Sequence, residues 1–206
     1  MDIDGGGWTV ILRRRINVLP QVDFDRPWDD YENGFGDLNT EFWLGLRNIH
    51  CLTTRDDVDL MIDLREADGN GMTWIYRKFK VDGSNEKYRL HIGEAEGPPN
   101  GHDAMAQHDG MLFTTKDNDN DLAGSSNCAI IAGGGWWLKN CYESFLTGAH
   151  TDRQVWQRLL WFSGMGSGVT AFNYYPDIDM KIRPKICVSQ LTIVTAQIKE
   201  DIKTLN

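Results

Sequence analysis

The protein has 206 residues, of which 41% are hydrophobic and 25% charged, and its formal net charge is −9. This composition predicts a globular protein of one large domain or two small lobes and excludes a disordered polypeptide. An acidic surface repels phosphate backbones and anionic membranes, and no apolar run approaches the roughly 20 residues of a membrane-spanning helix. We therefore expect neither nucleic-acid binding nor membrane insertion.

The N-terminal region is predicted to form one strand followed by two short helices. Residues 8–12 are rich in β-forming side chains, which predicts a strand. The basic triplet at residues 13–15 is expected to be the solvated end of that strand. Residues 39–45 have the pattern of a short capped helix, and residues 47–52 predict a second helix.

Three segments in the middle of the sequence predict an antiparallel sheet. Residues 58–64, 72–79 and 88–92 alternate polar and apolar side chains, as half-buried strands do. Turn-forming residues separate the three segments. A sheet with one face on the core and one face in solvent is therefore expected here.

Beyond residue 98 the sequence has mostly the chemistry of loops, up to about residue 176. Long loops in a compact domain are usually functional or bind a ligand. Residues 180–184 predict a strand that returns to the main sheet, and residues 191–206 form a moderately helical tail that is expected to fray.

The four cysteines, Cys51, Cys128, Cys141 and Cys187, allow three disulfide connectivities. No C-x-x-C pair occurs among them, which disfavours zinc. Cys128 and Cys141 lie in loop-like sequence, which favours disulfides over buried free thiols. The N-terminus does not resemble a signal peptide, so the residues alone leave open a cytosolic protein or a piece of a longer secreted one.

The most specific local motif is the acidic pentapeptide at residues 117–121, Asp-Asn-Asp-Asn-Asp. Three carboxylates this close repel each other unless a cation neutralises them, and Ca²⁺ prefers six to eight oxygen ligands. An EF-hand is excluded because its sixth position holds Leu122 instead of glycine and its twelfth holds Cys128 instead of glutamate. The pentapeptide by itself predicts either a calcium site or a solvated acidic turn.

Enzymatic activity is not expected. The five histidines are scattered, and none lies in a nucleophile motif. The glycines at 164, 166 and 168 are too few and too late in the sequence for a dinucleotide-binding loop.

Several motifs, in one order between residues 4 and 184, resemble those of the fibrinogen-related domain family. They are DGGGWTV at 4–10, VDFDRPW at 22–28, YENGFG at 31–36, EFWLG at 41–45, IH at 49–50, NCA at 127–129, GGWW at 134–137, NC at 140–141 and MKIRP at 180–184. The family includes the C-terminal domains of fibrinogen, ficolins, tachylectins, tenascins and angiopoietins. Agreement on this scale does not arise by chance.

The resemblance implies an α+β fibrinogen C-terminal-like domain at residues 1–190 that lacks the family's N-terminal disulfide lobe. A central twisted antiparallel sheet with short helices would come from residues 1–95 and 177–190. A loop-rich lobe that holds calcium and ligand would come from residues 96–176, and residues 191–206 would form a tail. The resemblance also implies a secreted, extracellular protein, and we expect the full-length protein to be oligomeric through its missing N-terminal region.

By the family's pattern, Cys128 and Cys141 form a disulfide. We further predict a Cys51–Cys187 disulfide, the alternative being that one of these two pairs with a segment outside this sequence. The resemblance implies that Ca²⁺ is held by the carboxylates of Asp119 and Asp121. Backbone carbonyls near Ala123 and Ser125 would complete that site.

The ligand pocket implied by the resemblance lies beside the calcium loop. Asn140–Cys141 is the candidate cis peptide bond, and Tyr142 stands where acetyl-binding members have a histidine. Ala132 stands where those members have an aromatic cage residue, and Val155-Trp156 stands where they have an aromatic–alanine pair. The fibrin-type pocket has acidic residues at the positions of Ala132 and Trp156. Trp156, Tyr142 and Tyr174 are expected to form a new aromatic wall, although Trp156 is equally well explained as a core residue.

Two functions follow from this resemblance. The main expectation is an innate-immune, lectin-like pattern-recognition module that binds microbial carbohydrate or acetylated groups with Ca²⁺ nearby. The alternative is a protein-binding module for a receptor or an extracellular-matrix partner. Aromatic walls bind sugar rings and apolar side chains alike, so the pocket residues do not decide between the two.

Overall fold

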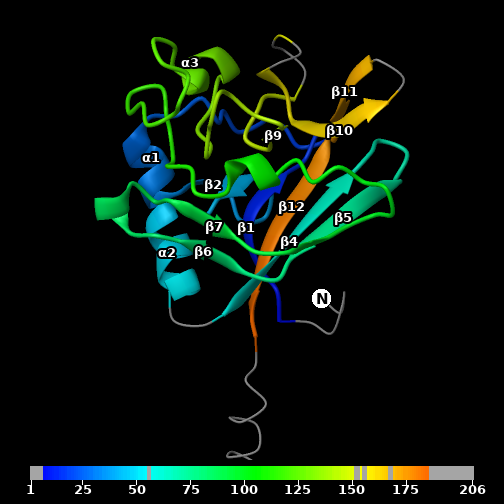
Figure 1. Cartoon of the computed structure of the whole chain (residues 1–206), viewed down its shortest axis with the longest axis horizontal. Helices are drawn as coiled ribbons and strands as arrows, with labels where there is room; N and C mark the ends of the chain where they lie inside the picture. Colours follow the sequence, from blue (N-terminus) through cyan, green and yellow to red (C-terminus); the bar gives the residue numbers. More distant parts are fainter. Residues whose placement is uncertain (1–6, 55–56, 151–153, 155–156, 167–168, 186–206) are drawn as a thin grey trace, which may run out of the picture.

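The computed structural model describes residues 7–54, 57–150, 154, 157–166 and 169–185, and of residues 163–172 only the backbone. It contains α-helices (α), 3₁₀ helices (η) and β-strands. In sequence order the elements are β1 (Thr9–Arg14), α1 (Trp28–Asn33), β2 (Phe35–Gly36), β3 (Phe42–Trp43), α2 (Leu46–Thr54), β4 (Val58–Arg65), β5 (Gly71–Tyr76), β6 (Phe79–Val81), η2 (Ser84–Glu86), β7 (Leu90–Ile92), β8 (Ala95–Glu96), η3 (Ala106–His108), α3 (Cys128–Ala132), β9 (Ser144–Phe145), β10 (Leu160–Gly166), β11 (Val169–Tyr174) and β12 (Asp177–Pro184). Figure 1 shows their arrangement.

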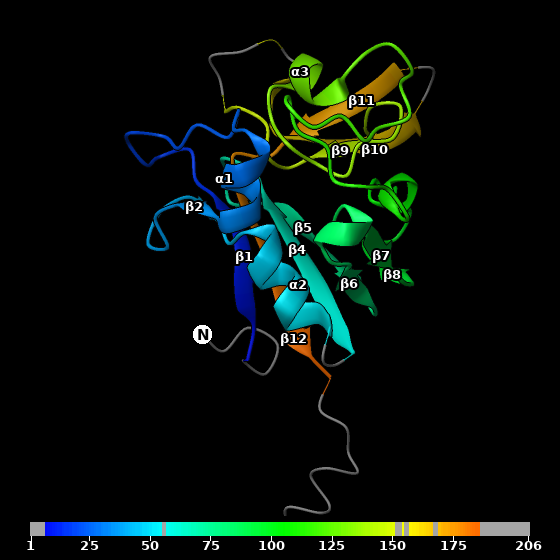
Figure 2. The same cartoon turned by 90° about the vertical axis from the view of Figure 1, so that its left-hand side faces the viewer.

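The main sheet has seven strands in the order β2-β3-β1-β12-β4-β5-β8. Strand β12 lies at its centre and pairs antiparallel with both β1 and β4. The predicted returning strand is thus confirmed, and it begins at Asp177. Helices α1 and α2 lie against one face of the sheet (Figures 1 and 2), so the molecule has the expected α+β architecture.

Strand β4 is buried on both faces, whereas its alternating pattern predicted one solvated face. Leu60 and Ile62 point into the core on one side. On the other side Asp63 is paired with Lys181 of β12 and accepts a 2.8 Å hydrogen bond from Thr73 of β5. Polar residues on this face satisfy one another, and for that reason the alternation did not reveal the burial.

The predicted helix at residues 39–45 is wrong, because the segment contains strand β3 instead. Phe42 and Trp43 pair with Arg13 and Leu12 of β1, and both aromatic side chains are buried. Tertiary packing has overridden the local helix signal. Helix α2 confirms the second prediction, whereas α1 lies in a segment that carried no helix prediction.

One of the three predicted central strands, at residues 88–92, lies in a different sheet from the other two. Strand β5 pairs with β4 as expected, but β6 and β7 form a separate two-stranded sheet. Residues 96–176, here called the distal lobe, contain α3 and a three-stranded sheet in the order β11-β10-β9. Both views place α3 and this small sheet beyond one end of the main sheet (Figures 1 and 2).

A buried ion pair joins the main sheet to the distal lobe. Arg14 of β1 is 1% exposed and donates from Nε to Oε1 of Glu41, which is fully buried, over 3.1 Å. Its Nη1 donates to the carbonyl of Gly148 at 2.6 Å, and the ring of Phe24 lies 3.8 Å from its Cζ. The basic triplet is therefore not a solvated strand end, because Arg14 lies on the same side of the strand as Leu12 and enters the core.

Glu41 accepts hydrogen bonds from the N-terminal segment around β1 and from the distal lobe. Its Oε1 accepts from His150 Nε2 at 2.6 Å and from the Arg15 N–H at 3.0 Å, and its Oε2 accepts from the Val22 N–H at 2.9 Å. Burial raises the pKa of Glu41, but the hydrogen bond from His150, the charge of Arg14 and the two backbone N–H groups outweigh it and lower the pKa to about 2. The carboxylate therefore stays ionised across the physiological range.

Candidate functional site

The Cys128–Cys141 disulfide is confirmed, with the two Cα atoms 5.2 Å apart. It joins the first residue of α3 to the segment that precedes β9. Asn127 caps the helix, since its side-chain oxygen accepts from the N–H groups of Ala129 and Ile130 at 2.8 and 3.1 Å. The cap and the bridge together fix the end of the acidic loop.

The three aspartates of residues 117–121 have different surroundings. Asp117 accepts from the Trp28 N–H at 2.9 Å and from the Thr115 hydroxyl at 2.8 Å, so its carboxylate fastens the loop to α1. Asp121 accepts from the N–H groups of Ala123 and Cys128, both at 2.7 Å. Asp119 is exposed and accepts from the Asp121 N–H at 3.2 Å. Asp117 therefore has a structural role, whereas Asp119 and Asp121 are the predicted carboxylate ligands.

The surroundings of Asp119 and Asp121 are compatible with a calcium ion. No ion pair with a lysine or arginine engages either carboxylate among the described residues. The described residues also contain no group of three or more His, Cys, Asp or Glu side chains placed to hold a metal. A cation here would need backbone carbonyls besides the two carboxylates, as predicted for Ala123 and Ser125. The site stays a prediction.

Buried aromatic side chains support the acidic loop. Trp136 and Trp137 are fully buried, with ring centroids 5.2 Å apart, and Trp137 Nε1 donates to the Tyr88 carbonyl at 2.8 Å. A Cβ at Gly135 would lie 2.8 Å from the Tyr31 ring, so only glycine fits before this pair. The loop therefore rests on a closely packed base.

His108 of η3 is a buried polar residue that links Trp137 of this aromatic core to Ser144 of β9. Its Nδ1 donates to the Trp137 carbonyl at 2.6 Å, and its Nε2 accepts from the Ser144 N–H at 3.2 Å. The ring must be neutral to make both bonds. Burial lowers the pKa of His108 to about 4, although the Trp137 carbonyl partly offsets this effect.

Several predicted ligand residues are placed differently from expectation. The one cis peptide among the described residues is Leu19–Pro20, so the Asn140–Cys141 bond is trans and the prediction was wrong. A trans bond is the default because a non-proline cis bond costs about 3 kcal/mol. Ala132 was predicted to line the ligand pocket, but it is fully buried within α3 and cannot line an open pocket. Asn140 is exposed, and Cys141 is half-buried.

The expected aromatic wall is divided. Tyr142 stacks on Phe145 of β9 with ring centroids 5.0 Å apart. Tyr142 itself precedes β9, and Tyr174 lies on β11, with β10 between these two strands. The Tyr174 hydroxyl is 3.3 Å from His150 Nδ1. Two strand spacings amount to about 10 Å, so the two rings do not form one continuous wall. Trp156 lies outside the described residues.

The predicted Cys51–Cys187 bridge stays a prediction. Cys51 is an exposed free thiol on α2. The buried face of that helix is carried by Leu46, Ile49 and Thr53, which leaves Cys51 on the solvent side. Cys187 lies outside the described residues.

Large apolar side chains are exposed on the acidic loop and on α3. Leu122 is 62% exposed, Ile130 61% and Ile131 43%. We call these three residues the apolar patch residues. The loop hydrogen bond from the Leu122 N–H to the Lys139 carbonyl, 2.7 Å long, holds the first of them beside the Cys141 segment. Three such side chains on one loop and on the helix that follows it have the composition of a contact surface.

The fold and the disulfide-closed lobe define a fibrinogen-like globe. The family model for the C-terminal globular domain of fibrinogen beta and gamma chains matches residues 1–185. The chain belongs to this fibrinogen C-terminal domain family. Among the residues that the structure describes, no helix is long and apolar enough to cross a membrane.

Three similar proteins illustrate the relationship. Tenascin-R of Gallus gallus is 40% identical over 184 residues, which are 89% of this chain and 13% of that protein. The fibrinogen-like globe domain of human ANGPTL2 has a TM-score of 0.78 at 33% identity and covers 89% of this chain and 83% of its own. A lamprey fibrin D-dimer complexed with the peptide Gly-His-Arg-Pro-amide has a TM-score of 0.72 at 29% identity, over 88% and 62% of the two chains. None of the three carries the name of an enzyme.

The sequence did not predict that the polar residues Arg14, His108 and His150 are buried. Arg14 had a usable signal, because strand periodicity places it two residues from the buried Leu12. His108 and His150 had none, since each lies in loop-like sequence and its partners are distant in the sequence.

The first prediction concerns His108 and acid stability. The folded state binds a proton on His108 near pH 4, whereas an unfolded histidine binds one near its ordinary value of about 6.5. The unfolded state therefore holds more protons between these values, and the free energy of unfolding falls as the pH drops through this window, by about 3 kcal/mol at most. Urea unfolding at a series of pH values measures this slope.

The variant His108→Gln serves as the comparison. It is expected to begin less stable at pH 7 because the links to Trp137 and Ser144 are disturbed. Its stability should change less between pH 6.5 and pH 4 than that of the wild type. Equal slopes for the two proteins would show that His108 does not titrate as described.

Proposed function

We propose that this chain is an extracellular protein-binding module whose contact surface includes the apolar patch residues Leu122, Ile130 and Ile131. The observation that carries the proposal is their exposure on the loop and helix of the distal lobe. The buried core of a binding surface between proteins is more apolar than the rest of the protein surface. We propose no catalytic role.

Two further observations support an extracellular recognition role. Disulfides such as Cys128–Cys141 persist in oxidising compartments and are rare in the cytosol. The similar lamprey fibrin structure is a complex with a short peptide, so a related globe binds a peptide. The chain spans 13% of tenascin-R, and assembly of a larger protein into oligomers is part of the proposal. Several copies would strengthen a weak single-site contact.

Calcium has a supporting role in this proposal. Asp119 and Asp121 would hold the ion through their carboxylates, with backbone carbonyls of Ala123 and Ser125. A bound cation would neutralise the acidic loop and stiffen the segment that carries Leu122. The hydrogen bonds of Asp121 to Ala123 and Cys128 already wrap the following residues around its carboxylate, which supports the assignment.

The microbial-carbohydrate function is the less supported reading. Ala132 is buried, and Tyr142 and Tyr174 lie two strands apart, so the described residues supply no continuous aromatic wall for a sugar. Glycan binding is therefore the alternative result that the binding experiment below can detect.

Calcium should stabilise the wild-type protein. A ligand of the native state at a hundredfold over its dissociation constant adds about 2.7 kcal/mol, which corresponds to a rise in Tm of about 5–10 °C at this length. The change Asp119→Asn should abolish most of that rise. Thermal unfolding in calcium and in chelator provides the measurement.

Asp68→Asn is the matched control. Like Asp119, Asp68 is an exposed aspartate whose carboxylate accepts the N–H of the residue two positions later, at 2.9 Å from Asn70. It lies in the turn between β4 and β5, and its variant should keep the full calcium effect. A calcium effect that is missing in the wild type, or that persists in Asp119→Asn, would rule out the site.

The binding surface is tested with an oligomerised domain on cells of the source organism. The change Ile130→Ser should weaken binding about tenfold, because an interface isoleucine contributes roughly 1.5 kcal/mol or more. Leu52→Ser is the control, since Leu52 is 42% exposed on α2. That variant should bind as the wild type does, and both variants should retain the wild-type Tm.

Treatment of the cells separates the two functions. Protease treatment should remove the binding, and glycosidase treatment should leave it. Binding that survives protease, is lost with glycosidase and reappears on arrayed glycans would establish the carbohydrate function instead.

A further inference from the structure

The small sheet of the distal lobe ends in a long open edge. Its strand order is β11-β10-β9, so among the described residues β11 has a neighbouring strand on one side only. Strand β11 has six residues, whereas the other edge strands described, β2, β6, β7, β8 and β9, have two or three. In Figure 1 the hairpin of β10 and β11 lies at the outside of the lobe, apart from α3.

The backbone pattern shows which residues of β11 face outward. The Phe162 N–H of β10 donates to the Glu143 carbonyl at 2.8 Å, so the backbone groups of Phe162 face away from β11. Phe162 is paired with Phe172, and in an antiparallel pair the partner of such a residue also faces away. The bulge in this ladder adds its extra residue to β10, so β11 alternates regularly. The N–H and C=O groups of Thr170, Phe172 and Tyr174 therefore point out of the open edge.

The residue types of β11 give this edge none of the usual protection. Proteins commonly keep edges from pairing with charged side chains, with proline or with very short strands. The sequence of β11, VTAFNY, contains no charged residue and no proline, and most of its residues favour strands. An open edge of this kind is completed by a second extended backbone, which offers donors and acceptors at the spacing of a strand.

We propose that β11 pairs antiparallel with β11 of a second copy of this chain, which joins the two small sheets into one. Antiparallel pairing of a strand with itself has the two-fold symmetry of most protein dimers. When Phe172 lies opposite Phe172 of the second copy, Thr170 lies opposite Tyr174, and every outward N–H finds a carbonyl, about six hydrogen bonds in all. No like charges meet, because β11 has none, and the register places two aromatic residues opposite each other, a favourable cross-strand pair.

This contact is separate from the apolar patch residues and from the calcium loop. It would hold two partner surfaces in one assembly and so strengthen a weak single-site contact. The domain's net charge of −9 opposes association at long range, and salt screens this repulsion. The shared edge is short, so the dimer belongs to the weak class of protein interfaces.

The test uses the intact chain over a range of concentrations. Sedimentation equilibrium in about 0.15 M salt should show monomer at about 10 µM and substantial dimer at about 1 mM. Amide hydrogen exchange, followed by NMR at both concentrations, locates the contact. The amides of Thr170, Phe172 and Tyr174 should exchange several-fold more slowly at the high concentration, because their N–H groups become bonded. Those of Ala171 and Asn173, which face β10 in both states, should not change.

Thr170→Pro removes an outward donor but no bond to β10, so it should stay monomeric at about 1 mM. Thr170→Val keeps the N–H and the strand preference and should dimerise as the wild type does. The exchange pattern of the wild type decides the question by itself if the proline variant does not fold. The proposal is overturned if the wild type stays monomeric or if Thr170→Pro dimerises equally well. It is also overturned if concentration protects the amides of Leu122, Ile130 and Ile131 instead of those of β11.

Discussion

The arrangement of this domain depends on one buried ion pair, Arg14 with Glu41. Arg14 lies on β1 and Glu41 directly precedes β3, but their remaining bonds reach the distal lobe through Gly148 and His150. A buried pair of this kind adds little net stability compared with apolar residues, yet losing one partner costs about 3–5 kcal/mol because the other charge is stranded. Its main effect is therefore geometric, since it sets where the lobe sits on the sheet.

That constraint explains how a lobe composed largely of loops can present a defined surface. The sheet holds the Arg14–Glu41 pair, and the pair holds the segment from Leu146 to His150. Next along the lobe, Trp136 and Trp137 pack beneath the disulfide, and His108 ties them to β9. The acidic loop and α3 stand on this base, and the apolar patch residues extend from them. Recognition residues on loops over a rigid support are a common arrangement in binding domains.

The sequence was sufficient wherever a signal was local or the family motifs were specific. Helix α2, the strand at residues 58–64, the returning strand and the Cys128–Cys141 bridge were all predicted and found. It was insufficient wherever distant partners decide the outcome. Phe42 and Trp43 became a strand because β1 offered an edge, and Asp63 became buried because Lys181 lies beside it. Neither segment contains a sequence pattern that identifies its partner in the fold.

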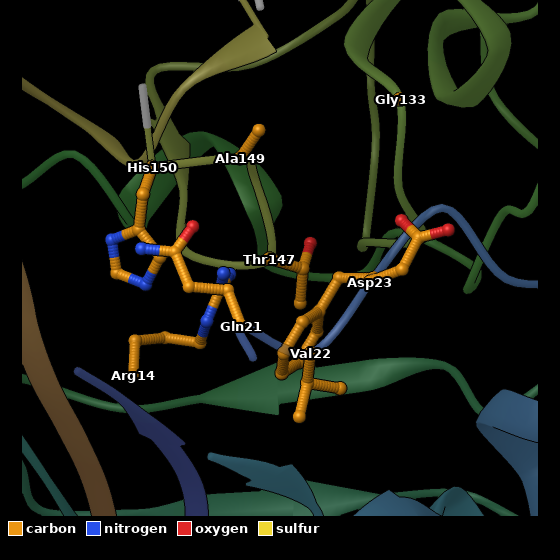
Figure 3. A pocket seen from close by; sticks show the side chains of 9 residues that line it. Arg14, Gln21, Val22, Asp23, Gly133, Thr147, Ala149 and His150 are labelled. Atoms are coloured by element: carbon orange, nitrogen blue, oxygen red, sulfur yellow. The ribbon is translucent and has the colours of Figure 1, made fainter. Parts of the chain in front are cut away.

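The ligand pocket shows the same limit more strongly. Ala132 was predicted to line the ligand pocket, but its direction into the core depends on how α3 packs. Tyr142 and Tyr174 are both half-buried aromatic residues of the lobe, and only the intervening strand β10 separates them. A cavity of about 270 Å³ lined by Arg14 and His150 (Figure 3) was missed entirely, because its lining residues come from four segments.

The most direct test of this account is amide hydrogen exchange in the wild type and in Glu41→Gln. The variant keeps the shape of the side chain but removes the charge that holds Arg14 and His150. We predict that amides of residues 133–138 and 144–150 exchange much faster in the variant. Amides in β4 and β12 should then change only by the smaller amount set by global unfolding. An equal increase across sheet and lobe, or none in the lobe, would contradict the claim that this ion pair fastens the distal lobe to the sheet.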